Sequence, residues 1–172
     1  MRSAVLVLLL GLTALPLRPA AAGPAPGMAW RGWDRGLEEA RASGRPVLVD
    51  VYTEWCGWCR RMKADVYSRA EVRDYIEDHF VVVALDAEAS DAARYEGRAF
   101  TSRTLAARFG VSGYPTTIFL RPDGAHLVNV PGYLDPARFL QVLRYIGDGH
   151  MDRGVSFQEY AKATAPGGAP GR

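Results

Sequence analysis

The sequence has few of the residues that build metal centres. Its 172 residues include only two cysteines and three histidines. A structural zinc site needs four ligands, usually in closely spaced pairs, and His79, His126 and His150 are scattered along the chain. Haem attachment needs a histidine directly after a Cys-x-x-Cys pair, and Arg60 occupies that position. We therefore expect no resident metal, and a soft metal held by the two cysteines is the one alternative left open.

The chain also lacks an excess of charge of one sign. It carries 21 Lys and Arg against 19 Asp and Glu. Two of the basic residues, Arg2 and Arg18, lie in the N-terminal 22 residues, so the rest of the chain holds 19 of each sign. Nucleic acids and anionic membrane surfaces select strongly basic patches. We therefore expect no nucleic-acid partner and no membrane-surface binding, and we find no sign of assembly beyond a monomer.

A long apolar run occurs only at the N-terminus. The uncharged run over residues 4–17 is shorter than the roughly 20 residues of a membrane-spanning helix. It follows a basic residue and leads to Ala20 and Ala22, the small-residue pattern of a signal-peptide cleavage site before Gly23. We predict that residues 1–22 are a signal peptide and that the protein is exported to the periplasm. No cysteine follows the cut directly, so a lipid anchor is not expected.

The rest of the chain is long enough for one domain with a hydrophobic core. Glycine and proline are concentrated at its two ends, and no internal repeat is present. We predict a flexible leader over residues 23–29, a single domain over residues 30–163 and a disordered tail over residues 164–172.

Hydrophobic patterns within this domain predict an α/β fold. Runs of β-branched and other apolar residues predict strands at residues 46–52, 80–85, 116–120 and 125–130. Helical patterns and capping signals predict helices at residues 34–42, 56–67, 68–79, 101–110 and 135–146. The order predicts a β-α-β unit followed by an antiparallel hairpin, hence a central mixed sheet of about four strands flanked by helices. Residues 86–100 are polar and are expected to be irregular.

Particular residues set the expected ends of these elements. Asp34 and Asp135 are expected N-caps, and Ser68 is expected to form a capping box with Glu71. Thr101 or Ser102 is expected to cap the helix after the polar segment. Aromatic residues on the strand and helix faces are expected in the core: Tyr52, Phe80, Phe119, Phe139 and Tyr145.

The two cysteines are only three residues apart, at Cys56 and Cys59. A disulfide that closes so short a segment hardly restricts the unfolded chain, so a purely structural bridge is a poor explanation. The pair lies where a buried strand turns into a helix, and a helix N-terminus favours a thiolate at Cys56. Cys59, one turn later, lies on the same face. The spacing predicts thiol–disulfide exchange, with an exposed attacking thiol and a sheltered resolving thiol.

Two segments carry a family resemblance. Residues 47–59 (VLVDVYTEWCGWC) resemble the active-site strand and loop of thioredoxins, and residues 111–116 (VSGYPT) resemble the loop that carries a cis proline opposite the dithiol. Exported members, namely SoxW-like periplasmic thioredoxins and the C-terminal thioredoxin domain of the DsbD electron carrier, are similar to this chain at residues 86–100, 132–139 and 157–160. The chain is identified as a thioredoxin-like protein with the thioredoxin-like fold.

The resemblance implies roles for particular residues. It makes Cys56 the nucleophile, Cys59 the resolving thiol, and Asp50 a buried carboxylate that exchanges protons with the resolving cysteine. Burial in an apolar strand should raise the pKa of Asp50, and the alternative is an aspartate bonded to backbone at the strand end. A cis Pro115 would leave the backbone of Tyr114 free to pair with an extended substrate. The implied substrate-binding residues are Trp55, Gly57, Trp58, Tyr114 and Pro115.

Some neighbours of the dithiol admit two interpretations. Gly57 permits the tight entry into the helix, and Trp58 either offers apolar surface to a partner or packs on its own loop. The basic residues that follow are expected on a solvated helix face, with a contribution to thiolate stability or partner steering as the alternative: Arg60, Arg61 and Lys63.

Two departures from the family pattern bear on redox behaviour. The family's lysine would fall near Ala84, so the charge partner of Asp50 is missing and its pKa should rise further. The residues between the cysteines are Gly57 and Trp58, not the Gly-Pro of reducing thioredoxins. The reduction potential of those thioredoxins therefore cannot be assigned to this chain.

The resemblance implies an exported oxidoreductase that reduces disulfides in periplasmic proteins. Its electrons would come from a membrane donor of the DsbD or CcdA type. No organic cofactor is implied, because the dithiol carries the electrons itself. A disulfide oxidase or isomerase and a non-catalytic metal carrier remain the alternatives.

Overall fold

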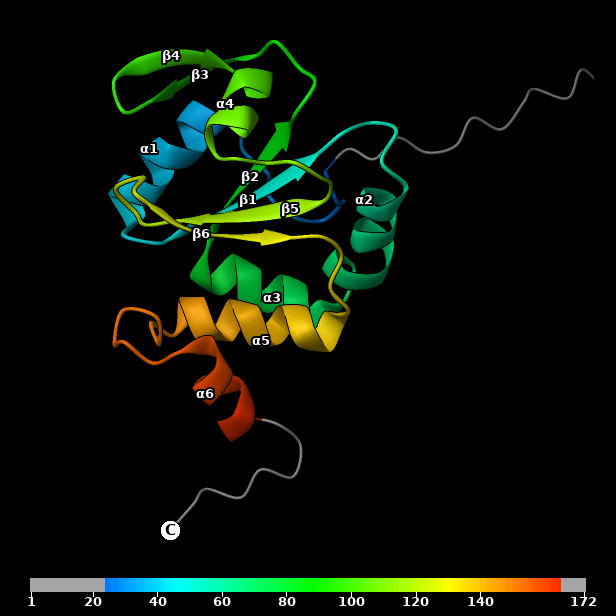
Figure 1. Ribbon diagram of the computed structural model, residues 1–172, viewed down its shortest axis with the longest axis vertical. Coiled ribbons are helices and arrows are strands. Elements are labelled where there is room, and N and C mark those ends of the chain that lie inside the picture. Colours follow the sequence, from blue (N-terminus) through cyan, green and yellow to red (C-terminus); the bar gives the residue numbers. More distant parts are fainter. Residues whose placement is uncertain (1–23, 165–172) are drawn as a thin grey trace, which may run out of the picture.

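A four-stranded mixed sheet forms the centre of the domain, in the order β2-β1-β5-β6 (Figure 1). β1 pairs in parallel with β2 and antiparallel with β5, and β5 continues into β6 as an antiparallel hairpin. This topology confirms the expected β-α-β unit followed by a hairpin. The strands are β1 (Val47–Tyr52), β2 (Val81–Asp86), β5 (Thr116–Leu120) and β6 (His126–Pro131).

The computed structural model describes residues 24–164. The predicted signal peptide and all but the first residue of the predicted tail lie outside the described residues. Part of the predicted leader is described, and it belongs to the core: Ala25 and Met28 are buried, and the Ala25 carbonyl accepts a hydrogen bond from the Trp30 indole at 2.8 Å.

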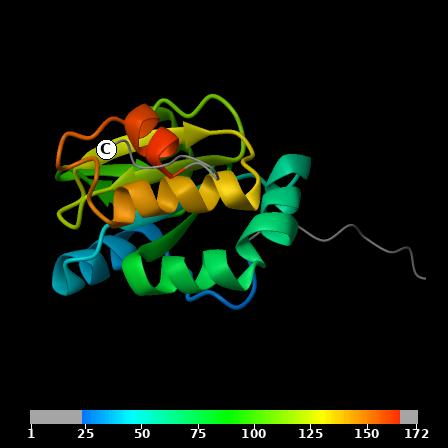
Figure 2. The same cartoon turned by 90° about the horizontal axis from the view of Figure 1, so that it is seen from below.

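Helices cover both faces of the sheet. Figure 1 shows α1 and α4 on one side of the sheet, and Figures 1 and 2 show α3 and α5 side by side on the other. None of the described helices is long and apolar enough to cross a bilayer. The helices are α1 (Trp33–Ser43), α2 (Gly57–Met62), the π-helical turn η1 (Lys63–Tyr67), α3 (Ala70–His79), α4 (Ser102–Arg108), α5 (Pro136–Gly147) and α6 (Phe157–Ala163).

Strand alternation in β1 divides the core into two clusters. Every residue of β1 is buried. Val47, Val49 and Val51 pack with residues of α1 and α4, whereas Leu48 packs with residues of α3 and α5. Asp50 and Tyr52 follow on the Leu48 side, because side chains two residues apart share a face. All five aromatic residues expected in the core are buried: Tyr52, Phe80, Phe119, Phe139 and Tyr145.

Two of the predicted helix caps are wrong. Gly32 is the N-cap of α1, and Asp34 lies in the first turn, where its carboxylate accepts a hydrogen bond from the Arg94 backbone N–H at 2.7 Å. The capping box of Ser68 with Glu71 does not form. The π-helical turn η1 extends through Tyr67, and α3 begins at Ala70 with Arg69 as its N-cap, one residue after the predicted cap. The caps expected at Thr101 and Asp135 are confirmed.

The segment expected to be irregular contains a second, two-stranded sheet. β3 (Ala92–Tyr95) pairs antiparallel with β4 (Arg98–Thr101). Tyr95 is buried against Phe109, with 4.9 Å between ring centroids, and the Trp33 indole donates to the Arg94 carbonyl at 2.9 Å. The expectation failed because short polar strands owe their order to contacts with α1 and α4 that are remote in sequence.

A glycine in α1 sets how closely that helix approaches the sheet. A Cβ at Gly36 would collide with the Cγ2 methyl of Val83 in β2. The Gly36→Ala variant should therefore lose about 1–2 kcal/mol of unfolding free energy, since overpacking outweighs the better helix propensity of alanine. Urea denaturation measures this change. Glu38→Ala, at an exposed site of the same helix, is the control, and equal stability of Gly36→Ala and the wild type would contradict the packing.

Candidate active site

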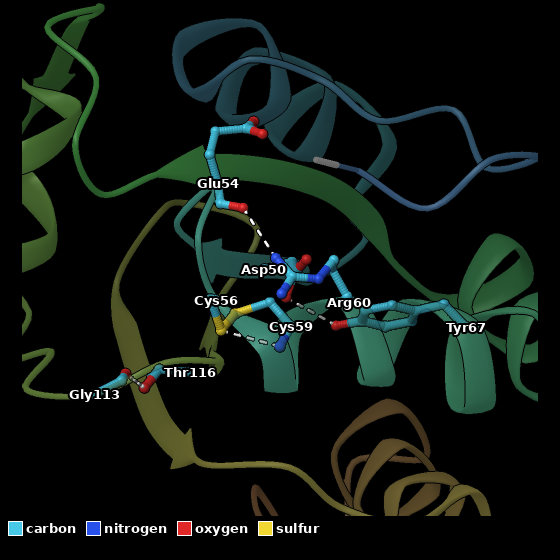
Figure 3. Close-up of a disulfide and its surroundings, with 8 residues drawn as sticks. All are labelled: Asp50, Glu54, Cys56, Cys59, Arg60, Tyr67, Gly113 and Thr116. Atoms are coloured by element: carbon cyan, nitrogen blue, oxygen red, sulfur yellow. Dashed lines mark hydrogen bonds between the residues drawn. A yellow bond between two sulfur atoms is a disulfide. The ribbon is translucent and has the colours of Figure 1, made fainter. Parts of the chain in front are cut away.

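Cys56 and Cys59 form a disulfide at the N-terminus of α2, with an S–S distance of 2.04 Å. Cys56 is the N-cap of this helix, and its sulfur accepts a hydrogen bond from the Cys59 backbone N–H at 3.0 Å (Figure 3). The prediction that Cys56 begins the helix is thus confirmed. After reduction, the same N–H group and the helix dipole would stabilise a thiolate at Cys56.

Both cysteines are buried in the oxidised protein, with 4% of each residue exposed. The expected contrast between an exposed Cys56 and a sheltered Cys59 is therefore wrong for this state. The reason is a small apolar cluster in which Tyr52, Tyr114 and Ala84 pack with the two cysteines. An attacking thiolate can therefore reach the disulfide only through the small exposed part of the two cysteines.

The loop before β5 lies against the disulfide. The Tyr114–Pro115 peptide bond is cis, as the resemblance implied. Tyr114 packs on the cysteine cluster, and it lies outside the ladder of β5, which begins at Thr116. The Thr116 hydroxyl donates to the Gly113 carbonyl at 2.8 Å and ties the two ends of this loop together (Figure 3).

Two exposed tryptophans lie next to the cysteines in sequence: Trp55 directly precedes Cys56, and Trp58 lies between Cys56 and Cys59. Trp55 is 64% exposed and Trp58 is 54% exposed, and they are the exposed large apolar residues of the described chain. Trp55 meets Tyr114 edge to face, with 5.9 Å between ring centroids. Trp58 packs on Tyr133, in the loop before α5, at 5.5 Å. Trp58 therefore combines an exposed face with packing on a segment other than its own loop.

The basic residues after Cys59 bind protein groups near the site. The Arg60 guanidinium donates to the Glu54 carbonyl at 3.2 Å (Figure 3). Arg61 pairs with Asp65 at 3.0 Å and lies 5.5 Å from the centre of the Trp58 ring. The Arg60 contact joins α2 to the loop before it, and none of these contacts involves the Cys56 sulfur.

Asp50 is buried beneath this site, with 6% of the residue exposed. The strand register places it between Ala84 of β2 and Thr117 of β5. Tyr67 donates a hydrogen bond from its hydroxyl to the Asp50 carboxylate at 3.2 Å. Burial raises the pKa of Asp50 from 3.8 to about 7, and the Tyr67 hydrogen bond partly opposes this rise. The expected rise in the pKa of Asp50 is confirmed. Its carboxylate accepts a hydrogen bond from the Tyr67 side chain, whereas the alternative interpretation required a hydrogen bond to the backbone.

Sequence reasoning missed Tyr67 as part of the site. It lies 17 residues after Asp50, at the end of a helix whose last turn is π-helical. Helical spacing alone does not reveal such a turn, so the sequence pattern does not predict the direction of the Tyr67 side chain.

No group of three or more His, Cys, Asp or Glu side chains within residues 24–164 is arranged to hold a metal ion. The two cysteine sulfurs, which the metal-carrier alternative would use as ligands, are bonded to each other in this structure.

Known proteins resemble this chain in both sequence and fold. The sequence model of the thioredoxin-like domain matches residues 33–147. A thiol:disulfide interchange protein DsbD from Pseudomonas sp. (strain JR1 / K1) is 33% identical over 118 residues, which are 67% of this chain and 19% of the relative. The chain thus spans about a fifth of the length of this relative.

Two solved structures are similar in fold. A thioredoxin from Thermus thermophilus is 30% identical with a TM-score of 0.58, and the match covers 74% of this chain and 94% of that one. A thioredoxin-fold protein from Helicobacter pylori is 25% identical with a TM-score of 0.62, and the match covers 70% of this chain and 80% of that one.

The buried carboxyl of Asp50 should make folding stability depend on pH. The pKa of Asp50 is higher in the folded protein than in the unfolded chain, so folding favours the protonated carboxyl. Its contribution to the free energy of unfolding is complete below pH 4 and is lost as pH rises through about 7. Relative to wild type, Asp50→Asn should therefore gain up to about 4 kcal/mol of unfolding free energy between pH 4 and pH 8. Urea denaturation of both oxidised proteins measures the difference.

Asp78→Asn, at an exposed site of α3, is the control and should not reproduce this pH dependence. A stability difference between Asp50→Asn and wild type that is the same at pH 4 and pH 8 would contradict a raised pKa at Asp50.

Proposed function

The chain belongs to the thioredoxin-like domain family, and we propose that it is an exported thiol–disulfide oxidoreductase that reduces disulfides in periplasmic proteins. The observation that carries this proposal is the Cys56–Cys59 disulfide at a helix N-terminus, with the buried carboxyl of Asp50 beneath it. A thiolate-stabilising position and a proton-exchanging group are the two requirements of a dithiol that cycles between oxidation states.

The proposed cycle begins with the reduced protein. The Cys56 thiolate attacks one sulfur of a substrate disulfide, forms a mixed disulfide and releases the other substrate sulfur as a thiolate. Cys59 then gives its proton to Asp50 and attacks the Cys56 sulfur. The Cys56–Cys59 disulfide forms, the second substrate thiolate leaves, and two electrons have passed to the substrate.

The environment of Asp50 suits this proton transfer. A pKa of about 7 lets the carboxyl accept a proton from Cys59 and release it again near neutral pH. An exposed aspartate would remain ionised and would be a weaker base toward a thiol. The burial that makes Asp50 costly to ionise thus supports its proposed role in the second step.

Residues around the disulfide would bind the substrate. Gly57 leaves the surface beside the disulfide without a side chain, although a Cβ there would make only an ordinary contact, with the Arg60 guanidinium at 3.7 Å. Tyr114 lies outside the β5 ladder, and its backbone would pair with an extended substrate chain. The two exposed tryptophans add apolar surface on which a partner can dock. The proposed substrate-binding residues are Trp55, Gly57, Trp58, Tyr114 and Pro115.

The comparisons support thiol–disulfide exchange, whereas the direction of electron flow and the compartment are part of our proposal. The relative from Pseudomonas is described as a thiol:disulfide interchange protein, and the fold neighbour from Thermus as a thioredoxin. We infer that the chain takes electrons from a membrane donor of the DsbD or CcdA type and needs no organic cofactor. The predicted signal peptide supports export, and an oxidising compartment supplies disulfide substrates.

Removing the resolving thiol should trap the substrate. Cys59→Ser leaves the Cys56 thiolate able to attack but removes the group that completes the cycle, so mixed disulfides with exported proteins should accumulate. Non-reducing gels and mass spectrometry of the cell envelope fraction detect them. Cys56→Ser, which loses the attacking thiolate, is the matched control and should trap far less.

A Cys59→Ser protein that traps nothing would contradict disulfide exchange. If the reduced wild-type protein instead binds one soft metal ion per dithiol, and either cysteine substitution abolishes that binding, the metal-carrier alternative would replace our proposal.

A further inference from the structure

A π-helical turn lies between the disulfide helix and α3. This turn, η1, directly follows α2 and ends at Tyr67. π-helical turns are rare and often occur at functional sites. The extra residue in the turn leaves two consecutive side chains, Val66 and Tyr67, fully buried in the core. Tyr67 thereby enters the side of the sheet on which Asp50 lies.

The ring of Tyr67 is held on two sides. Trp30 and Phe139 each meet it edge to face, with ring centroids 5.6 Å away in both contacts. These contacts come from the segment before α1 and from α5, so the ring cannot turn without disturbing the core. Figure 3 shows the Tyr67 hydroxyl directed at the Asp50 carboxylate.

The other neighbours of Asp50 bring no positive charge. β2 presents Ala84 and β5 presents Thr117 in register with it. The titratable groups nearby are Tyr67, Tyr52 two residues along β1, and Cys59 once it is reduced. The Arg60 guanidinium is hydrogen-bonded to the Glu54 carbonyl. Among the ion pairs of residues 24–164, none includes Asp50.

We propose that Tyr67 is a positioning residue for Asp50, whose hydroxyl fixes one carboxylate oxygen and stabilises the ionised form in a site that has no cation. The other oxygen is then free to take the proton of Cys59 in the second step of the cycle. The redox consequence rests on the proposed function, whereas the Tyr67–Asp50 contact stands without it.

Physical chemistry gives the contact a definite direction. A hydrogen bond donated to a carboxylate favours its charged form. Burial raises the pKa of Tyr67 itself well above its ordinary value, so the phenol remains a neutral donor at every pH at which the dithiol works. Losing this donor would leave Asp50 with the full effect of burial.

The test is Tyr67→Phe, which keeps the ring and its two edge contacts but removes the hydroxyl. Carboxyl-carbon NMR titration of the oxidised protein follows Asp50 directly. Its half-titration point should move up by about one pH unit, because a hydrogen bond to a charged group is lost. In Cys59-dependent release of substrate from the mixed disulfide, the pH profile should move by the same amount and in the same direction.

Tyr145→Phe is the matched control. Tyr145 is also buried in this core cluster, and its hydroxyl donates to the Val155 carbonyl at 2.6 Å, away from Asp50. Its loss should leave both the titration and the pH profile in place. Asp50→Asn should abolish the pH dependence of substrate release that comes from this carboxyl. Adding Tyr67→Phe to Asp50→Asn should then change the pH profile of release no further.

The outcomes separate this inference from the proposed function. An unmoved Asp50 titration in Tyr67→Phe would overturn the positioning role. A Tyr67→Phe effect on the rate profile that persists in the Asp50→Asn background would also overturn it, since Tyr67 would act by another route. A shifted titration in a protein that exchanges no disulfides would support the contact and refute the function.

Discussion

Asp50 places a carboxylate inside a strand whose other five residues are apolar or aromatic and buried, where ionisation is costly. This cost shapes the surrounding structure. The carboxylate lies on the same face as the core residue Leu48 and the disulfide neighbour Tyr52, so β1 joins the hydrophobic core to the redox site. Its one side-chain hydrogen bond, from Tyr67, is supplied by a helical turn that directly follows the disulfide helix.

The segment from α2 through η1 therefore serves the site at both of its ends. Its N-terminus holds the Cys56 sulfur against a backbone N–H group, and its last residue holds the carboxylate of Asp50. The two groups require opposite conditions, because a thiolate is favoured by the helix dipole whereas the carboxylate must protonate readily. A surface-facing helix end and a buried π-helical turn supply these conditions within eleven residues of one chain segment, from Gly57 to Tyr67.

Much of this arrangement could be predicted from local sequence. The β-branched run before the cysteines, the Cys-x-x-Cys spacing and the caps at Thr101 and Asp135 are short-range signals, and each corresponds to the observed element. Contacts between remote segments could not be predicted. The β3–β4 hairpin depends on packing with Trp33 and Phe109, and the direction of Tyr67 depends on one extra residue in a helical turn. The burial of Cys56 likewise follows from Tyr114, 58 residues later in the chain.

The reduction potential of the Cys56–Cys59 pair tests the central claim most directly. The chain without residues 1–22 would be equilibrated with glutathione buffers, and the fluorescence of the adjoining Trp55 and Trp58 would follow the fraction reduced. We predict a value below about −220 mV, at which the disulfide form is stable and the dithiol acts as a reductant supplied by a dedicated donor. A value above about −180 mV would contradict it, because such a protein would pass its disulfide to substrates as an oxidase or isomerase.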